Sequence, residues 1–217
     1  HEAGFQNYKI VRGIPQRGFR IASVTSRDEN REIKCDGLIT TDPKVALTMC
    51  VGDCPAVIVT TGQRTPLMLL HIGAQNAADG IVGKAIDRFR HRFEIHPNRL
   101  IVGIGPGICA DCYDVEWIRA QYGMRKDWEP FLWRDANGRK PHCDLRGYIV
   151  SRFLDRGVLA RHISMARECT CCSRYPNGEF FLDSHHRAKT QGREGRFLVA
   201  TAMGRQPWSL KRFFGWS

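Results

Sequence analysis

Three short runs of strand-forming residues, each closed by a polar turn, constrain the fold more than any other feature of the sequence. They occupy residues 45–51, 56–60 and 67–71. Apolar and β-branched runs of this length favour buried strands. The next segment differs, because apolar residues recur at helical spacing between residues 81 and 93 and form one face. Strands followed by an amphipathic helix predict a mixed α/β domain.

The rest of the chain continues this alternation. We expect one or two strands in residues 8–25, and further strands at residues 99–104, 162–165, 179–182 and 196–202. Helices are expected near residues 115–121 and 144–156, the second stopped by Gly157. Residues 124–142 are expected to form a loop or hairpin.

The division into domains follows from the absence of repeats and low-complexity linkers. A single domain over residues 1–205 is predicted, with a basic aromatic tail at residues 206–217 that docks on it. Because the chain begins without Met, its N-terminus is expected to be truncated.

The cysteines and the apolar segments indicate a cellular location. Nine cysteines, an odd number, include the adjacent Cys171 and Cys172. A secreted protein of this size more often has an even, spaced set, so reduced thiols and a cytoplasmic location are predicted. No apolar stretch reaches the roughly 18 residues that a membrane span needs, and the first residues lack the features of a signal peptide.

The formal net charge of +11 favours acidic partners such as phosphate, nucleotides or nucleic acid. The basic residues are spread along the whole chain, so a generally basic surface without a specific partner is the alternative. Motifs typical of RNA-binding and DNA-binding domains, serine hydrolases, P-loop proteins and zincins are missing from the sequence. Nucleic acid is therefore not an expected partner, and both a monomer and a homodimer stay open.

Cys54 and His71 are the first candidates for chemistry. Cys54 lies in the turn after the strand at residues 45–51, and His71 ends a strand just before Gly73. Neighbouring strand ends can bring the sulfur and the imidazole to one pocket. The pair suits zinc or copper, and it equally suits a cysteine nucleophile with a histidine base. The spacing alone also fits a third interpretation, in which Cys54 and His71 are ordinary packing residues.

A series of motifs surrounds this pair between about residues 15 and 203. They are DGLIT at residues 36–40, VGDCP at 51–55, HIG at 71–73, IGPGI at 104–108, CYDV at 112–115, CDL at 143–145, ECT at 168–170 and SHHR at 184–187 with GR at 192–193. In order and spacing they resemble D-G-L-x-T, A-D-C-x-P, H-x-G-W-R-G, I-G-P-x-I and S-[HY]-R-R…G-R of the YfiH family. Its members are also called laccase-domain proteins, polyphenol oxidases or peptidoglycan editing factors.

The resemblance implies a single-domain α/β/β/α sandwich with mixed sheets and one metal ion, usually zinc. The metal would be held by a histidine, the A-D-C cysteine and the H-x-G-W-R-G histidine, and Cys54 and His71 match the last two. Members of this family are credited with purine nucleoside phosphorolysis, adenosine deamination, methylthioadenosine cleavage, phenol oxidation or editing of a cell-wall precursor. Further substrate contacts are expected at Gly105, Pro106, Ser184, His185, Arg187 and Arg193.

The departures from the family pattern bear on the metal. Arg17 stands at the place of the first ligand histidine, and a guanidinium cannot bind a cation. Ala74 and Gln75 replace the Trp-Arg pair. Two alternatives follow. Zinc is held by Cys54, His71 and a third group, for which His185, His186 or water are candidates. Otherwise the metal is lost, and Arg17 holds an anion and favours a reactive Cys54 thiolate.

The leading hypothesis is a zinc-dependent enzyme that acts on adenosine, inosine or methylthioadenosine, with phosphate or water as acceptor. Cys54, His71 and Arg17 would be catalytic, and Arg187 and Arg193 would stabilise negative charge. The alternatives are a metal-free cysteine hydrolase or amidase of a cell-wall precursor, and a binding protein without activity. Copper is a possible single ion, but eight scattered histidines are too few for a multicopper oxidase.

Five further cysteines are candidates for a second, structural zinc site. Cys109 and Cys112 have the spacing of zinc ligands. Cys169, Cys171 and Cys172 are too close together in the sequence for a usual zinc knuckle, so such a site is not expected.

Overall fold

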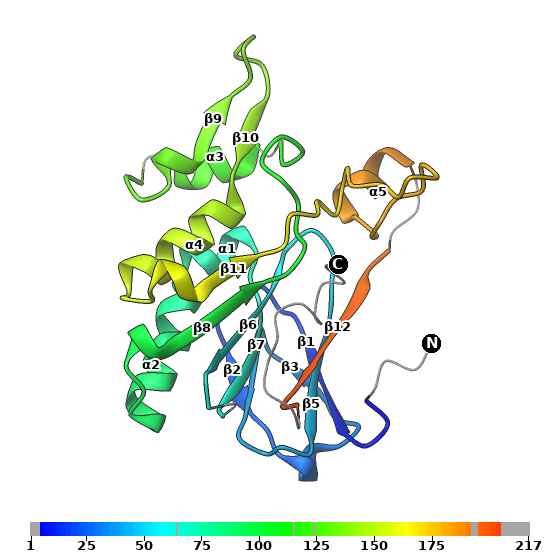
Figure 1. Cartoon of the computed structure of the whole chain (residues 1–217). Coiled ribbons are helices and arrows are strands. Elements are labelled where there is room, and N and C mark those ends of the chain that lie inside the picture. Colours follow the sequence, from blue (N-terminus) through cyan, green and yellow to red (C-terminus); the bar gives the residue numbers. More distant parts are fainter. Residues whose placement is uncertain (1–4, 64, 115, 124, 192–194, 205–217) are drawn as a thin grey trace.

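Two β-sheets and a layer of helices build the protein, as the computed structural model shows for residues 5–204 except 64, 115, 124 and 192–194 (Figure 1). The larger sheet has the strand order β11-β8-β6-β7-β4-β2 and the smaller one β12-β5-β1-β3. Both sheets mix parallel and antiparallel neighbours: β6 pairs with β7 and β8 antiparallel, whereas β8 pairs with β11 parallel. The prediction of a layered α/β fold with mixed sheets is confirmed.

The strands of the larger sheet are β2 (Ile21–Ser23), β4 (Gly37–Thr40), β6 (Ala56–Thr61), β7 (Leu67–His71), β8 (Leu100–Ile104) and β11 (Ile163–Met165). Those of the smaller sheet are β1 (Lys9–Ile14), β3 (Glu32–Lys34), β5 (Val45–Val51) and β12 (Phe197–Ala202). A separate hairpin joins β9 (Leu132–Arg134) and β10 (Pro141–Cys143). The α-helices are α1 (Ala74–Ala78), α2 (Ile81–Phe93), α3 (Glu116–Tyr122), α4 (Leu145–Asp155) and α5 (His185–Gln191), and 3-10 turns lie at Ser26–Asp28, Pro97–Arg99, Glu129–Phe131 and Ala160–His162.

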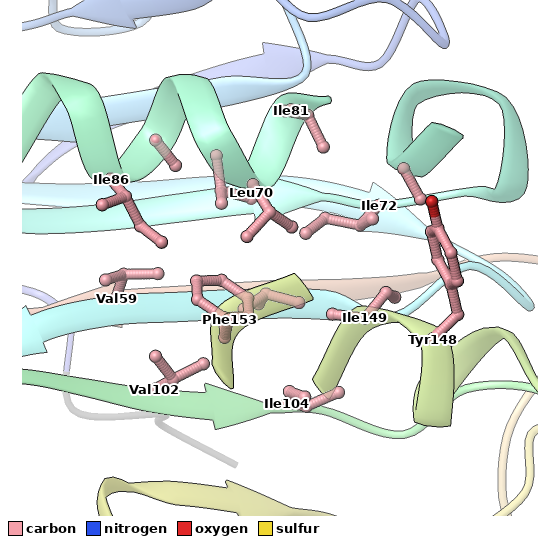
Figure 2. Close-up of a cluster of buried hydrophobic side chains, with 14 of the residues drawn as sticks. Val59, Leu70, Ile72, Ile81, Ile86, Val102, Ile104, Tyr148, Ile149 and Phe153 are labelled. Carbon is pink, nitrogen blue, oxygen red and sulfur yellow. The ribbon is translucent and has the colours of Figure 1, made fainter. Parts of the chain in front are cut away.

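One hydrophobic core lies between the helices and the larger sheet. Figure 2 shows Ile81 and Ile86 of α2 and Phe153 of α4 facing the sheet, where Val59 and Leu70 are among the strand residues below them. All five are almost completely buried. Burial of each such side chain stabilises the fold by about 1.5–3 kcal/mol, and it explains the helical spacing of apolar residues between positions 81 and 93.

A second core fills the space between the two sheets. Val45, Leu47 and Met49 of β5 pack there against Leu67 and Leu69 of β7. Strand β7 is therefore buried on both faces, because its other side chains reach the core under the helices. Burial on both faces accounts for the uninterrupted apolar run at residues 67–71.

Two sequence expectations about local structure had different outcomes. Helix α4 ends before Gly157, which adopts φ +88°, as predicted, and at its start the Oδ1 of Asp144 caps the helix by accepting from Gly147 N at 2.9 Å. The strand expected at residues 179–182 is wrong, since Phe180 makes only one isolated bridge, to Arg174. There the chain forms a short turn through Gly178, not an extended pair.

The smaller sheet turns its other face outward. On that face Ile10 of β1 is 45% exposed and Leu198 of β12 is 60% exposed. In the described part of the chain, the helices that cover a sheet thus lie on the larger one (Figure 1). No described helix has both the length and the apolar character to cross a membrane. The tail predicted at residues 206–217 lies outside the described residues.

Candidate functional site

Strand pairing brings Cys54 and His71 together. Antiparallel pairing of β6 with β7 sets Ala56 opposite His71, and Cys54 lies two residues before Ala56 in the turn that leads into β6. Gly73 follows β7 and lies against the same sulfur, because a Cβ at this position would be 2.9 Å from Cys54 Sγ. The two side chains that the sequence singled out therefore meet at one place.

Substitution of Gly73 should disturb the thiol directly. In Gly73→Ala the added methyl group forces Cys54 Sγ to shift, and we expect a loss of about 1–3 kcal/mol in the free energy of unfolding with a changed rate of Cys54 alkylation. Gly62→Ala is the matched control, since a Cβ there meets nothing within 4 Å. Urea unfolding and iodoacetamide labelling measure both effects, and equal behaviour of the two variants would contradict the contact.

Asp36 completes the group and was not singled out as a site residue from the sequence. It precedes β4, which pairs with β7, and its Oδ1 lies 2.9 Å from His71 Nδ1. The carboxylate is fully buried and also accepts backbone N–H bonds from Gln16, Arg17 and Gly18 at 3.1, 3.0 and 2.9 Å. Arg17 adopts φ +60°, which allows the three amides to converge on one side chain.

These contacts set the charges of the group. Burial opposes ionisation of Asp36, but the hydrogen bonds from His71, Gly18 and Gln16 hold its pKa below the ordinary value. Burial also opposes the charged form of His71 and would by itself lower the pKa of this residue. Hydrogen bonds with Asp36 and Cys54 instead raise the pKa of His71 to about 9. Since Nδ1 faces Asp36, the other ring nitrogen, Nε2, faces Cys54. Around neutral pH a protonated imidazole lies between a carboxylate and a sulfur.

The pH dependence of stability follows from these directions. His71 binds its proton more tightly when folded, so its contribution is complete below its ordinary pKa of 6.5 and is lost as the pH rises through about 9. The contribution of Asp36 is present above its ordinary pKa of 3.8 and is lost as the pH falls. We expect the free energy of unfolding to drop by roughly 2–3 kcal/mol between about pH 6 and pH 9.5. Urea unfolding checks this, and His71→Gln should show a smaller alkaline drop; an equal drop in both proteins would count against the assignment.

A pocket of about 420 Å³ opens in front of the group. This volume lies within the range of about 300–1,000 Å³ that is usual for small-molecule sites. Its lining comprises Pro15, Arg17, Gly52, Asp53, Cys54, His71, Gly73, Ala74, Gln75, Asn76, Tyr113, His185, His186 and Arg196. Arg17, Cys54, His71 and His185, which the sequence analysis proposed as site residues, thus share one pocket.

Asn76 and Tyr113 line the pocket although no site role was given to them from the sequence. Asn76 lies inside α1, where its Oδ1 accepts from Gly73 N at 2.8 Å and its Nδ2 donates to His71 O at 2.9 Å. It fixes the turn that carries His71. Burial and the nearby Cys54 raise the pKa of the Tyr113 hydroxyl, so this group stays neutral and can donate a hydrogen bond.

Asp53 ties the far wall of the pocket to the turn of Cys54. Its Oδ1 accepts from Thr170 Oγ1 at 2.8 Å and its Oδ2 accepts from His186 N at 2.6 Å. The imidazole of His186 is held in turn by Asp114, with 2.7 Å between Nε2 and Oδ1. Through these bonds Asp53 orients its neighbours Thr170 and His186.

Other residues proposed from the sequence lie around the pocket and are not among its lining residues. Gly105 N donates to Ala56 O at 2.8 Å, so the turn of Gly105 and Pro106 packs behind the turn of Cys54. Ser184 Oγ accepts from Arg187 N at the start of α5. Arg187 donates to the carbonyls of Thr170, Cys171 and Leu182 and thereby shapes the adjoining loop. Arg193 lies outside the described residues.

The zinc site that the resemblance implies needs a third protein ligand beside Cys54 and His71. Among the described residues, no other His, Cys, Asp or Glu forms with these two a group of ligand atoms within 4.8 Å of one another. Arg17, which stands at the sequence position of the family's first ligand histidine, lines this pocket, and its guanidinium repels a cation. The donors present at this pocket therefore do not fit a three-ligand zinc ion.

The family is decided by comparison with known proteins. Residues 4–203 match the family model described as "Multi-copper polyphenol oxidoreductase laccase". The chain belongs to the YfiH-type laccase-domain family. The structure of YlmD from Geobacillus stearothermophilus is similar to this family member with a TM-score of 0.78 and 26% identity, over 92% of this chain and 75% of that one. The fold of Bacillus licheniformis YfiH is also similar, with a TM-score of 0.76 at 23% identity over 92% and 76% of the two chains.

Curated relatives of this family member carry enzyme names. "Purine nucleoside phosphorylase YlmD" of Geobacillus stearothermophilus is 30% identical over 76% of this chain and 58% of its own length. "Purine nucleoside phosphorylase Cj1217c" of Campylobacter jejuni is 26% identical over 76% of this chain and 67% of its own length. "Adenosine deaminase RL5", from an unknown prokaryotic organism, is 24% identical over 63% and 53%. The chain thus spans somewhat more than half the length of two of these relatives and two thirds of the other.

Proposed function

We propose that this chain cleaves purine nucleosides, with inorganic phosphate as the acceptor, and that Cys54, His71 and Asp36 move the proton that the reaction needs. The observation that carries the proposal is the hydrogen-bonded series of these three side chains at the base of a pocket that Arg17 also lines. The names of three relatives, two purine nucleoside phosphorylases and one adenosine deaminase, support the substrate class.

Basic side chains supply the electrostatic part of this chemistry. Arg17 and Arg196 line the pocket together with His185 and His186. A guanidinium donates two parallel hydrogen bonds to phosphate. Arg17, which stands in place of the family's metal-binding histidine, therefore suits an anion and not a cation. Phosphate held there would share the pocket with Cys54.

The reaction requires one bond to form and one to break. A phosphate oxygen bonds to C1′ of the ribose while the bond between C1′ and the purine nitrogen breaks, and the electron pair of that bond stays on the purine. The leaving purine takes up a proton, which the Cys54–His71 pair supplies from the protonated imidazole. Asp36 keeps its charge and stabilises that imidazole before the transfer.

Product analysis tests the proposal. The purified protein is incubated with inosine, adenosine or methylthioadenosine, with and without inorganic phosphate, and free base and sugar phosphate are quantified by chromatography. Phosphorolysis yields the two products in equal amounts and only with phosphate. Release of base at the same rate without phosphate would show hydrolysis, and no release from any of the three nucleosides would reject the proposal.

Arg17 should govern the use of phosphate. Loss of one charged hydrogen-bonding partner lowers affinity by about 10–100-fold, so Arg17→Asn should raise the KM for phosphate by that factor and leave the KM for the nucleoside nearly unchanged. Asparagine tolerates the φ of +60° at this position. Arg17→Lys, which keeps the charge, is the control and should recover part of the loss. Equal phosphate KM values in all three proteins would contradict the role of Arg17.

A cysteine hydrolase or amidase acting on a cell-wall precursor is the second candidate. It is favoured by the order Cys54, His71, Asp36, in which a thiol, an imidazole and an orienting carboxylate follow one another as in cysteine hydrolases. Such an enzyme forms a thioester at Cys54, whereas phosphorolysis forms no covalent intermediate there. Mass spectrometry after incubation with cell-wall precursor peptides distinguishes the two, because only the hydrolase gains the mass of an acyl group on the peptide that contains Cys54.

A further inference from the structure

Four cysteines from two separate loops meet beside the pocket. Cys109 and Cys112 follow β8, and Cys169 and Cys172 follow β11; a bridge between Gly107 and Cys169 lays the two loops side by side. All four sulfur atoms lie within 4.8 Å of one another. We propose that they bind a structural zinc ion, independently of the function proposed for Cys54.

The spacing of these cysteines in the sequence corrects the expectation that they form no zinc site. Cys169 and Cys172 are separated by two residues, as are Cys109 and Cys112, so each loop offers one C-x2-C pair. Cys171 lies between the second two and concealed this regularity. Two C-x2-C pairs on neighbouring loops are the arrangement of four-cysteine structural zinc sites.

The distances favour a metal over disulfides. In a tetrahedral site with zinc–sulfur bonds of about 2.3 Å, neighbouring sulfurs lie roughly 3.8 Å apart. Cys109 Sγ and Cys172 Sγ are 3.9 Å apart. A disulfide needs about 2.05 Å between its two sulfurs, and all four cysteines are free in this structure.

Backbone amides already point at one of the sulfurs. Cys109 N and Cys171 N donate to Cys169 Sγ at 3.1 and 3.3 Å. Hydrogen bonds of this kind stabilise the negative charge of metal-bound thiolates and fix their orientation. The guanidinium groups of Arg146 and Arg187 bind carbonyls of the same loop, where their positive charge would partly offset that of four thiolates around a bound divalent ion.

A metal would also explain what holds residues 166–184 in place. This segment joins β11 to α5 through turns and isolated bridges, and its buried apolar side chains are only Ala166 and Cys169. Arginine bonds to its carbonyls hold this segment in part, and a metal cross-link would stabilise it further where the hydrophobic core is so small. Thr170, inside the segment, donates to Asp53 in the wall of the pocket, so the metal would stabilise that wall without contacting substrate.

Metal analysis of the full chain tests the inference. The protein is produced with added zinc and purified without chelators, and its metal content is measured by plasma mass spectrometry. We expect one zinc ion per chain, retained in Cys54→Ser and in Cys171→Ser, the matched control from the same loop. Cys109→Ser and Cys172→Ser should each lose most of the bound zinc. Loss of the zinc in Cys54→Ser, with retention in Cys109→Ser, would assign the metal to the pocket and overturn the inference.

A second measurement covers the case in which a variant does not fold. The unaltered protein is titrated with an organomercurial that attacks thiolates while zinc release is followed with a metal indicator, and cobalt is then exchanged into the protein. We expect zinc to leave as four thiols react, a cobalt spectrum typical of tetrahedral thiolate ligation, and a Tm lower by about 10 °C after metal removal. Protein isolated without metal, with free thiols or with disulfides, would overturn the proposal.

Discussion

Cys54→Ser should lower the rate of purine release from inosine by at least about 10³-fold, because a serine hydroxyl is a much weaker acid than a thiol and shares a proton with His71 less readily. The substitution changes one atom, and Cys54 is only partly buried, so the fold should persist. Initial rates with saturating phosphate measure the effect. Thermal unfolding of the same samples should show a Tm change of no more than a few degrees.

Cys50→Ser is the matched control for this experiment. Cys50 lies on β5, is also partly buried, and is not among the residues that line the pocket. Its hydrogen bond from Arg12 can be kept by a serine hydroxyl. We expect unchanged activity. If Cys54→Ser retains more than about a tenth of the rate, the thiol takes no part in proton transfer.

Asp36→Asn should destabilise the protein by about 3 kcal/mol, since removal of one partner from a buried charged pair leaves the other uncompensated. The substitution also turns an acceptor of several N–H bonds into a group with its own N–H donors facing Gln16, Arg17, Gly18 or His71. We further expect the pKa of His71 to fall, because Asp36 raises it. Urea unfolding at about pH 6 measures the loss.

The control for Asp36 is an exposed carboxylate in a weak ion pair. Asp87 on α2 is about half exposed and lies 4.0 Å from Arg156. Asp87→Asn should change the free energy of unfolding by less than about 0.5 kcal/mol. Similar losses in the two variants would mean that the carboxylate of Asp36 contributes little beyond its volume, and the orienting role assigned to it would fail.

Much of the fold could be predicted from residue patterns because the buried elements repeat with a fixed period. The apolar runs that became β5 and β7 and the helical spacing in α2 are of this kind. The segment after β11 could not be predicted in this way. Its order comes from arginine bonds to carbonyls and from cysteine sulfurs, and such contacts produce no periodic pattern in the sequence. For this reason the prediction of a strand at residues 179–182 was wrong.

Part of the site could also be predicted. Cys54 and His71 were identified from their places at strand ends, and Arg17 from its place in a family motif; the structure brings all three to one pocket. Asp36 begins the DGLIT motif, but only the pairing of β4 with β7 shows that its carboxylate faces His71. The four-cysteine cluster also has a signal in the sequence, its two C-x2-C pairs, but Cys171 beside Cys172 conceals the second pair.

The protonation state of His71 is the claim on which the account of the site depends, and nuclear magnetic resonance measures it directly. With ¹⁵N-labelled histidine, the two ring nitrogens of His71 are followed as the pH is varied. The account expects a doubly protonated ring at neutral pH that loses its proton near pH 9, and at a lower pH in Asp36→Asn. A neutral ring at pH values around 7, or a titration that Asp36→Asn leaves unchanged, would contradict it.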